Sequence, residues 1–407
     1  MLNLKNFVYF NLLLIVVKFI YSVNFGDKFF DTEWKILYEN LVHDFSLSYY
    51  KINGVNVPSV YMPPLYAYFL YLFSFFNLPE IFTVQIILFV QCILSGISGY
   101  VLFRILNNFF AEKYSYLVTI AYILYPLNFY SSSQISSVTL QVFLFILYLY
   151  FFINFLKNKN FIFFGIISGF SMLIRGEFWL LFFFSIIFLL LKNKKEGKKV
   201  FLASLIGIIV ISPYLVRNYL IFDKLILTKS SGYNLWRGNS SEFDINGDSN
   251  TLIFNKDLKN IENNLISKNQ LHLYELYIDD YYYQKAKSNI FGNLYLYFIH
   301  YIKKFISFSI FNYNSTYPNY FNPLVFIPEL IISIFAILGI GKNIFTRKRF
   351  DTLLLVIFFY LILIPVFFIL PRYKLFILPV YFIFVAYFFD GLLSKKNFFQ
   401  KTIQQSK

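Results

Sequence analysis

The segment GDKFFDTEWKILYEN, residues 26–40, follows directly after the first apolar run and carries four of the 21 acidic residues of the chain. From Trp34 onward, apolar side chains recur at intervals of three and four residues, which is the spacing of one face of an amphipathic helix. That face consists of Trp34, Leu37, Tyr38, Leu41, Val42 and Phe45. We therefore expect a helix that lies along the external membrane surface, with Asp31 at its N-terminal end.

The rest of the chain is far more apolar than this segment. Of its 407 residues, 58% are hydrophobic and 14% are charged, and the mean hydropathy is +0.59. A soluble domain carries about 25% charged residues. Apolar runs of about 20 residues, which can cross the hydrocarbon core as a helix, recur along the chain. We predict an all-α polytopic membrane protein with ten spans, at 7–23, 81–103, 115–130, 135–156, 161–174, 177–191, 199–216, 323–341, 352–370 and 375–393.

The distribution of charge predicts the orientation of these spans. The net charge of +15 comes largely from Lys and Arg in alternate short loops, and loops rich in these residues stay in the cytoplasm. The N- and C-termini are then cytoplasmic, and no nucleic-acid partner is expected. The chain divides into an N-terminal membrane module (1–216) with a first external loop (24–80), a large periplasmic loop (217–322) and C-terminal membrane helices (323–407).

Two sets of charged residues lie within apolar segments. Lys18 belongs to the first span, and we expect it to snorkel toward the nearby membrane surface. In residues 292–311, His300, Lys303 and Lys304 share one helix face. We expect an interfacial helix there, with this polar face directed outward.

Asp31 fits two roles on residue type alone. As an N-cap it would accept backbone N–H bonds. As a general base at the bilayer surface it would deprotonate the hydroxyl of an acceptor. Periodicity does not choose between them. Asp27 and Glu39 are interpreted as solvated surface charges, and Glu33 points away from Asp31 because it is only two residues further along the helix.

Five motifs follow in order along the chain. They are YMPPLYAYFL (61–70), RGE (175–177), PYLVRNYLIF (213–222), SGYNLWRGNS (231–240) and PRYKLFILP (371–379). Together with the acidic first loop, their order and spacing resemble the membrane glycosyltransferases of the GT-C type. The similarity is closest to the bacterial relatives of the dolichyl-phosphate-mannose–protein mannosyltransferases (glycosyltransferase family 39), and it covers nearly the whole chain.

The resemblance implies a GT-C-like fold and an enzyme that takes a sugar from a polyprenyl phosphate at the external face. It implies a catalytic role for the first-loop acids. Relatives often carry an adjacent Asp-Glu pair, whereas Thr32 separates Asp31 from Glu33 here, so either acid can be the base. Relatives also often carry an acid in the fourth span, where this chain has Gln141.

The remaining site residues are expected to bind the donor and the acceptor. Arginine offers phosphate a planar fork of N–H donors and stabilises the charge that develops on it. The expected phosphate-binding residues are Arg217, Arg372, Arg175 and Lys374. The expected substrate-binding residues, for which loop capping is an equally good explanation, are Tyr61, Tyr233, Asn234 and Asn239.

No cofactor or resident metal is expected. His43, His272 and His300 are far apart in the sequence and form no ligand pattern. First-loop carboxylates have the right chemistry for Mg²⁺ or Mn²⁺, but no further pattern supports such a site. The chain also lacks a glycine-rich nucleotide-binding motif, which fits a lipid-linked donor.

We therefore predict a glycosyltransferase of the bacterial inner membrane, which transfers a hexose or pentose from a polyprenyl-phosphate donor to a glycan, lipid or protein acceptor. One rival is an O-antigen-type polysaccharide polymerase. The other is a flippase or transporter of lipid-linked sugars, which would carry polar residues at mid-membrane and often shows paired repeats. The sequence does not specify the sugar, the acceptor or the oligomeric state.

Overall fold

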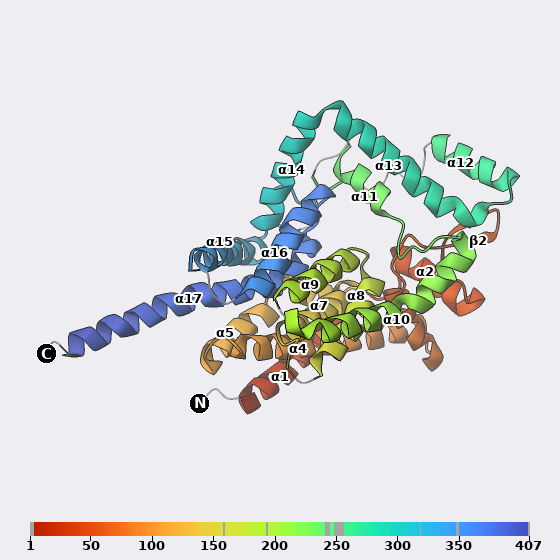
Figure 1. Cartoon of the computed structure of the whole chain (residues 1–407). Helices are drawn as coiled ribbons and strands as arrows, with labels where there is room; N and C mark the ends of the chain where they lie inside the picture. Colours follow the sequence, from red (N-terminus) through yellow and green to blue (C-terminus); the bar gives the residue numbers. More distant parts are fainter. Residues whose placement is uncertain are drawn as a thin grey trace.

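The computed structural model describes residues 4–157, 159–192, 194–240, 245–247, 256–317, 319–346 and 350–405. It is almost entirely helical, as predicted. Figure 1 shows the N-terminal helices gathered in one bundle, from which the helices of the large loop (217–322) stand apart. Among the described residues, five helices have the length and apolar composition to cross a membrane, and shorter apolar helices accompany them.

Helices occupy the predicted spans of the N-terminal module. Aromatic and aliphatic side chains from most of them form one continuous core with the C-terminal helices. Glycines allow two of these helices to pack closely, because a Cβ at Gly165 or Gly169 would collide with the facing helix. The elements are α1 (Leu4–Phe25), α4 (Glu80–Asn107), α5 (Glu112–Ile123), α6 (Pro126–Ser132), α7 (Val138–Ile153), α8 (Asn160–Ile174), α9 (Phe178–Lys192) and α10 (Gly197–Phe222).

Two predicted spans are not single helices. The span at 115–130 is broken between α5 and α6, because Pro126 begins a new helix and cannot continue the old one. The span at 352–370 ends early, since α16 (Asp351–Leu363) passes into a 3₁₀ turn, η5 (Ile364–Val366), that contains Pro365. Both breaks leave non-helical backbone, and both of these segments matter for the site.

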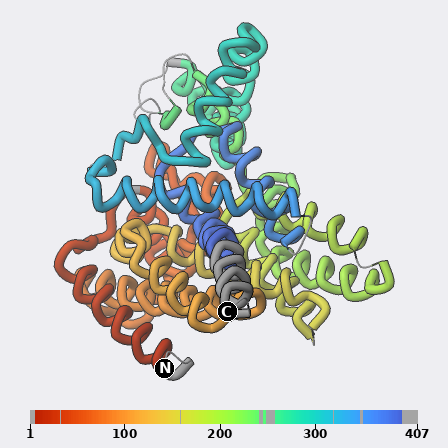
Figure 2. The backbone as a smooth tube through the Cα atoms, turned by 90° about the vertical axis from the view of Figure 1, so that its left-hand side faces the viewer, coloured from red at the N-terminus to blue at the C-terminus, as the bar shows by residue number. Residues whose placement is uncertain are grey.

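The C-terminal helices are α15 (Pro323–Thr346) and α17 (Lys374–Gln405), and the short turn η6 (Pro371–Tyr373) precedes α17. Figure 2 shows α15 crossing α17. Gly339 permits this crossing, because a Cβ there would collide with the backbone of Phe384. The start of α17 lies deep in the core, which fixes the position of the turn before it.

The amphipathic helix predicted in the first loop is present as α2 (Thr32–Asp44). Its apolar face packs on protein, since Trp34 and Leu37 are buried against α3 (Leu65–Tyr71) and Trp34 meets the ring of Tyr66 edge-on. The end of the predicted face was wrong, because Phe45 has a positive φ of 50° and is 80% exposed. A hairpin that the sequence did not suggest follows, with β1 (Ser48–Ile52) antiparallel to β2 (Val55–Pro58), and the turn η1 (Leu72–Phe76) closes the loop.

The large loop contains α11 (Ser231–Gly238), α12 (Lys256–Ser267), η4 (Leu271–Leu273), α13 (Tyr274–Gly292) and α14 (Leu294–Ser309). Helix α14 corresponds to the predicted interfacial helix, but the orientation of its polar face was predicted only in part. Lys303 is exposed as expected, whereas Lys304 is buried inside the protein and apolar residues such as Tyr295 and Phe298 are exposed. Lys304 turns inward because its ammonium meets backbone oxygens of α11 and of the segment after α16.

The prediction for Lys18 was also wrong. This residue does not snorkel but is buried between α1, α4 and α6. Its ammonium donates to Ser95 Oγ at 2.7 Å and to the carbonyl of Asn128 at 3.4 Å. Polar partners within the bundle thus replace the contact with the membrane surface.

Candidate functional site

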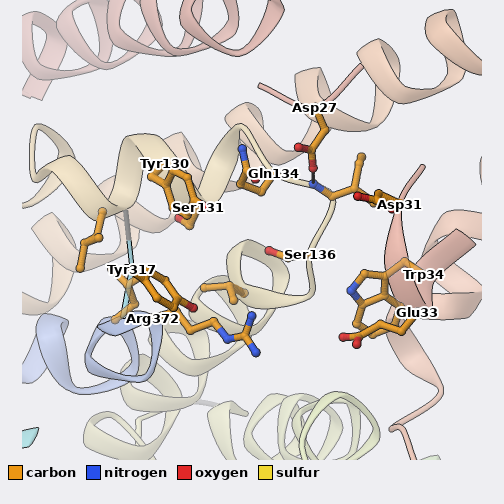
Figure 3. A pocket seen from close by; sticks show the side chains of 14 residues that line it. Asp27, Asp31, Glu33, Trp34, Tyr130, Ser131, Gln134, Ser136, Tyr317 and Arg372 are labelled. Atoms are coloured by element: carbon orange, nitrogen blue, oxygen red, sulfur yellow. Dashed lines mark hydrogen bonds between the residues drawn. The ribbon is translucent and has the colours of Figure 1, made fainter. Parts of the chain in front are cut away.

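A cavity of about 290 Å³ opens where four distant parts of the chain meet (Figure 3). These parts are the approach to α2, the α6–α7 connection, the segment before α15 and the turn η6. Apolar side chains form part of its wall, but most of the labelled side chains in Figure 3 are polar. The lining residues are Asp27, Asp31, Glu33, Trp34, Leu127, Tyr130, Ser131, Gln134, Ile135, Ser136, Val138, Tyr317, Arg372 and Leu375.

Asp27 is part of this wall and is not the solvated surface charge that we expected. Its backbone N–H donates to the carbonyl of Ser133 at 3.0 Å, and its carboxylate accepts from the N–H of Ile135 at 2.6 Å. Gly26 lies so close to Ser133 that no side chain would fit. Burial and the neighbouring Asp31 both raise the pKa of Asp27.

The two predicted catalytic acids line the same cavity. Asp31 directly precedes α2 and is exposed, and Glu33 lies half-buried in the first turn of that helix. Burial raises the pKa of Glu33, while the positive charges of Arg372 and Arg237 act in the opposite direction. Both acids thus line the cavity, and Asp31 is the more exposed of the two.

Arg372 is the predicted phosphate-binding residue that lines the cavity. It sits in η6, immediately before α17, and Figure 3 shows its guanidinium extending toward Glu33. Tyr317, from the segment before α15, lies beside it. Proline at the first position of the turn and the buried start of α17 hold Arg372 at this point.

Arg237 was missed, although it lies within the quoted motif SGYNLWRGNS. Its guanidinium lies over the ring of Phe368 at 4.1 Å, and its Nε is buried without a hydrogen-bond partner among the described residues. Its charge acts on both Glu33 and Tyr61. Spacing gave no signal for it, because the motif was read for its amides and aromatic rings.

The other basic residues make contacts within the protein and do not line the cavity. Arg217 donates to the carbonyls of Ser59 (2.8 Å) and Leu47 (3.3 Å), and so secures both ends of the hairpin region. Arg175 pairs with Glu177 and stacks on Phe376. The phosphate-binding roles predicted for these residues stay predictions.

Lys374 forms a buried ion pair. Its ammonium lies 3.0 Å from a carboxylate oxygen of Glu329, and the two side chains are 4% and 1% exposed. Tyr320 donates to the same carboxylate at 2.8 Å. Lys374 therefore anchors α17 to α15 beside the cavity, and a contact with phosphate stays a prediction.

The predicted substrate-binding residues lie around Arg237. Tyr61 stacks with Tyr49, with ring centroids 6.2 Å apart, and lies 6.1 Å from the ring of Tyr233. Asn234 is half-buried. Asn239 is buried, and its amide donates to two carbonyls at 2.8 Å each. None of the four lines the cavity, so their binding roles stay predictions.

No metal centre is evident among the described residues. Three carboxylates line the cavity, yet no three His, Cys, Asp or Glu side chains in the described ranges lie close enough together to hold an ion. The chemistry available at the site is thus that of carboxylates facing a guanidinium.

Comparison with known proteins gives a family match over part of the chain and a similar fold. Residues 61–216 match the sequence model of the dolichyl-phosphate-mannose-protein mannosyltransferase family. The structure is similar to the oligosaccharyltransferase of Archaeoglobus fulgidus tethered to an acceptor peptide, with a TM-score of 0.55 and 14% identity over 96% of this chain and 50% of that one. A second structure of the same enzyme, in complex with an inhibitory peptide and a dolichol-phosphate, has a TM-score of 0.55 and 13% identity. The match covers 98% of this chain and 52% of that one.

The family match confirms the resemblance over residues 61–216, and the structural similarity confirms the predicted fold. The chain is an integral membrane protein with the all-α, polytopic GT-C fold, and it spans about half the length of the solved structures that it matches. A comparison with curated proteins finds no match.

Proposed function

We propose that the protein is a glycosyltransferase that moves a single sugar from a polyprenyl-phosphate donor to a hydroxyl of a cell-envelope glycan, lipid or protein. One observation carries the proposal: carboxylates of the first loop and an arginine of the last turn face one another across a single cavity. The proposed site opens to the periplasm of a bacterial inner membrane, with both termini cytoplasmic.

In this proposal Asp31 is the general base. It is the exposed acid of the cavity, whereas Glu33 is half-buried. Asp31 takes the proton of the acceptor hydroxyl as that oxygen attacks the anomeric carbon. The bond to the phosphate oxygen breaks in the same step, so a single displacement inverts the anomeric configuration.

Arg372 stabilises the leaving phosphate. Negative charge develops on the phosphate oxygens as the sugar departs, and a fixed guanidinium in a partly dehydrated site stabilises that charge strongly. Arg237 adds a second positive charge that acts on Glu33. Glu33 holds the two cations in place before the donor binds, and no cofactor is needed for this step.

The size of the cavity supports a small donor group. At about 290 Å³ it lies at the lower end of the ~300–1,000 Å³ range of ligand sites, which suits one sugar better than an oligosaccharide. The lipid-linked donor is supported by the family match and by the dolichol-phosphate in a complex of the similar archaeal enzyme.

A transfer assay in liposomes tests the proposal. Purified protein receives radiolabelled polyprenyl-phosphate sugars and a cell-envelope acceptor fraction. We expect transfer by the wild type and its loss in Asp31→Asn. The matched control is Glu39→Gln, which removes an exposed acid on the same helix whose only described ion pair is with Lys35.

The alternatives give different results in the same assay. Labelled sugar that crosses the bilayer without release of polyprenyl phosphate would identify a flippase. Growth of the acceptor by several units per event from an oligosaccharide donor would identify a polymerase. Unchanged transfer by Asp31→Asn would leave the proposed glycosyltransferase activity standing and would assign the role of general base to Glu33.

A further inference from the structure

Lys304 is a buried lysine that forms no ion pair with any described carboxylate. Its side chain on α14 is 0% exposed. Its ammonium donates to the carbonyls of Gly238 (2.8 Å) and Phe367 (2.7 Å) and to Oδ1 of Asn239 (3.1 Å). Burying a charge costs several kcal/mol, and an apolar residue at such a place is often no less stabilising. Stability alone therefore gives no clear reason for a lysine at position 304.

The three oxygens belong to two segments that each carry an arginine of the site. Gly238 and Asn239 directly follow Arg237 at the end of α11. Phe367 precedes Phe368, and the guanidinium of Arg237 lies over the ring of Phe368. The same segment continues into η6 and Arg372. Lys304 thus donates hydrogen bonds to the backbone next to Arg237 and to the segment that leads to Arg372.

Further contacts make the junction between these segments tight. The amide of Asn239 donates to the carbonyl of Val366 at 2.8 Å. Gly238 lies against the backbone of Phe367, where a side chain would not fit. We call this contact between residues 236–240 and 366–370 the arginine joint.

We propose that Lys304 is a positioning residue, which fixes the arginine joint so that Arg237 and Arg372 both face Glu33 and the donor phosphate. The part that concerns phosphate rests on the proposed function. Lys304 lies behind the joint, bonded to backbone, so it acts through the arginines and does not touch the donor. The neighbouring Lys303 is exposed on the same helix and makes none of these bonds, and it provides a matched control.

The experiment compares Lys304→Met with Lys303→Met in the full-length protein. Hydrogen exchange reports the joint directly, because amides exchange faster where local structure opens. We expect faster exchange in 236–240 and 366–370 in Lys304→Met alone. In transfer assays we expect kcat/KM for the donor to fall at least tenfold, while the KM for the acceptor changes less than twofold. Lys304→Gln keeps an N–H₂ donor, so its exchange rates and kcat/KM should lie between those of the wild type and Lys304→Met. It replaces Lys304→Met in the experiment if Lys304→Met does not fold.

A double-mutant cycle with Arg237→Gln separates positioning from general stability. If Lys304 acts through the arginines, its substitution should cost less in the Arg237→Gln background than in the wild type. Equal costs in both backgrounds, unchanged exchange at the joint, or equal losses for donor and acceptor would each overturn the proposal. Faster exchange at the joint in Lys304→Met, beside a wild type that transfers no sugar, would support the joint and overturn the proposed function alone.

Discussion

Glu33 and Arg372 face each other across one cavity, although the first lies in the loop after α1 and the second just before the last helix. Arg237, from the large loop, acts on the same carboxylate. The site therefore exists only when the first loop, the large loop and the turn η6 come together. Glu33 therefore lies within reach of the charge of both arginines, beside the cavity where a donor phosphate is proposed to bind.

Glu33→Gln should bind polyprenyl phosphate more tightly than the wild type. The carboxylate competes with phosphate for Arg372 and Arg237, so its removal frees both cations. We expect an affinity about tenfold higher, which corresponds to about 1.4 kcal/mol, with slower turnover because the product leaves more slowly. Titration of the purified variants with polyprenyl monophosphate measures this. Loss of transfer without tighter binding would instead identify Glu33 as the base.

The buried pair of Lys374 and Glu329 should respond asymmetrically to substitution. Lys374→Met leaves the carboxylate of Glu329 buried and unpaired, which typically costs about 3–5 kcal/mol. Lys374→Met combined with Glu329→Met removes both charges and should recover much of that loss, although Tyr320 then lacks its acceptor. Thermal unfolding in detergent measures Lys374→Met, Glu329→Met and the double variant. A double variant as unstable as the sum of the single ones would show that the two residues are not coupled.

Stability should depend on pH through Glu275, a buried acid of α13. Its carboxylate accepts from the N–H groups of Val60 (2.6 Å) and Tyr61 (2.7 Å) and from Ser59 Oγ (3.1 Å). Burial raises the pKa of Glu275 to about 7, although the hydrogen bonds from these three donors act to lower it. The folded state therefore holds a proton that the unfolded state has already lost, between the unfolded value of 4.5 and about 7.

The contribution of Glu275 is thus fully present below pH 4.5 and is lost as the pH rises through about 7. By linkage the change is about 3 kcal/mol at most. The unfolding midpoint of the wild type relative to Glu275→Gln should fall between pH 5 and pH 8. Parallel pH profiles of the two proteins would contradict this assignment.

Local patterns in the sequence predicted the elements better than their contacts. The spans and α2 follow from composition and from periodicity, which short segments carry by themselves. Pro126 and Pro365 explain where two predicted spans break, and these breaks could have been read from the sequence. The burial of Lys304 on α14 could not, because Lys304 is satisfied by oxygens from segments far away in the chain.

The candidate site was predicted in part. Asp31, Glu33 and Arg372 were named from the resemblance, and all three line the cavity. Asp27 was taken for a surface charge because its bond to the N–H of Ile135 depends on how α6 and α7 pack against the first loop. Arg237 carries no sequence signal of its own, since its position over the ring of Phe368 depends on a segment far away in the chain.

Transfer should not require a divalent metal. The proposed step uses a carboxylate base and guanidinium groups, and the described residues contain no set of three ligands for an ion. We expect activity within twofold of the untreated enzyme after dialysis against EDTA, with a Mg²⁺-reconstituted sample as the control. Loss of activity on chelation and recovery with Mg²⁺ or Mn²⁺ would show that the acids of the cavity bind metal in the working enzyme.

Gln141 and Gln91 are both fully buried, but they should respond to substitution in opposite ways. Both polar atoms of the Gln141 amide lack a hydrogen-bond partner among the described residues. Gln91 instead accepts from the hydroxyl of Tyr66 at 2.9 Å and donates to the carbonyl of Gln134 at 2.8 Å. Leaving a buried polar group unpaired costs about 1–3 kcal/mol.

Gln141→Leu should therefore raise the thermal midpoint, whereas Gln91→Leu should lower it because two partners lose their bonds. Transfer by Gln141→Leu should equal that of the wild type, since Gln141 does not line the cavity. The two variants are compared by thermal unfolding and by the liposome assay. A more stable Gln141→Leu that no longer transfers sugar would show that this amide, in the span where relatives often carry an acid, serves the reaction and is held ready for the substrate at a cost in stability.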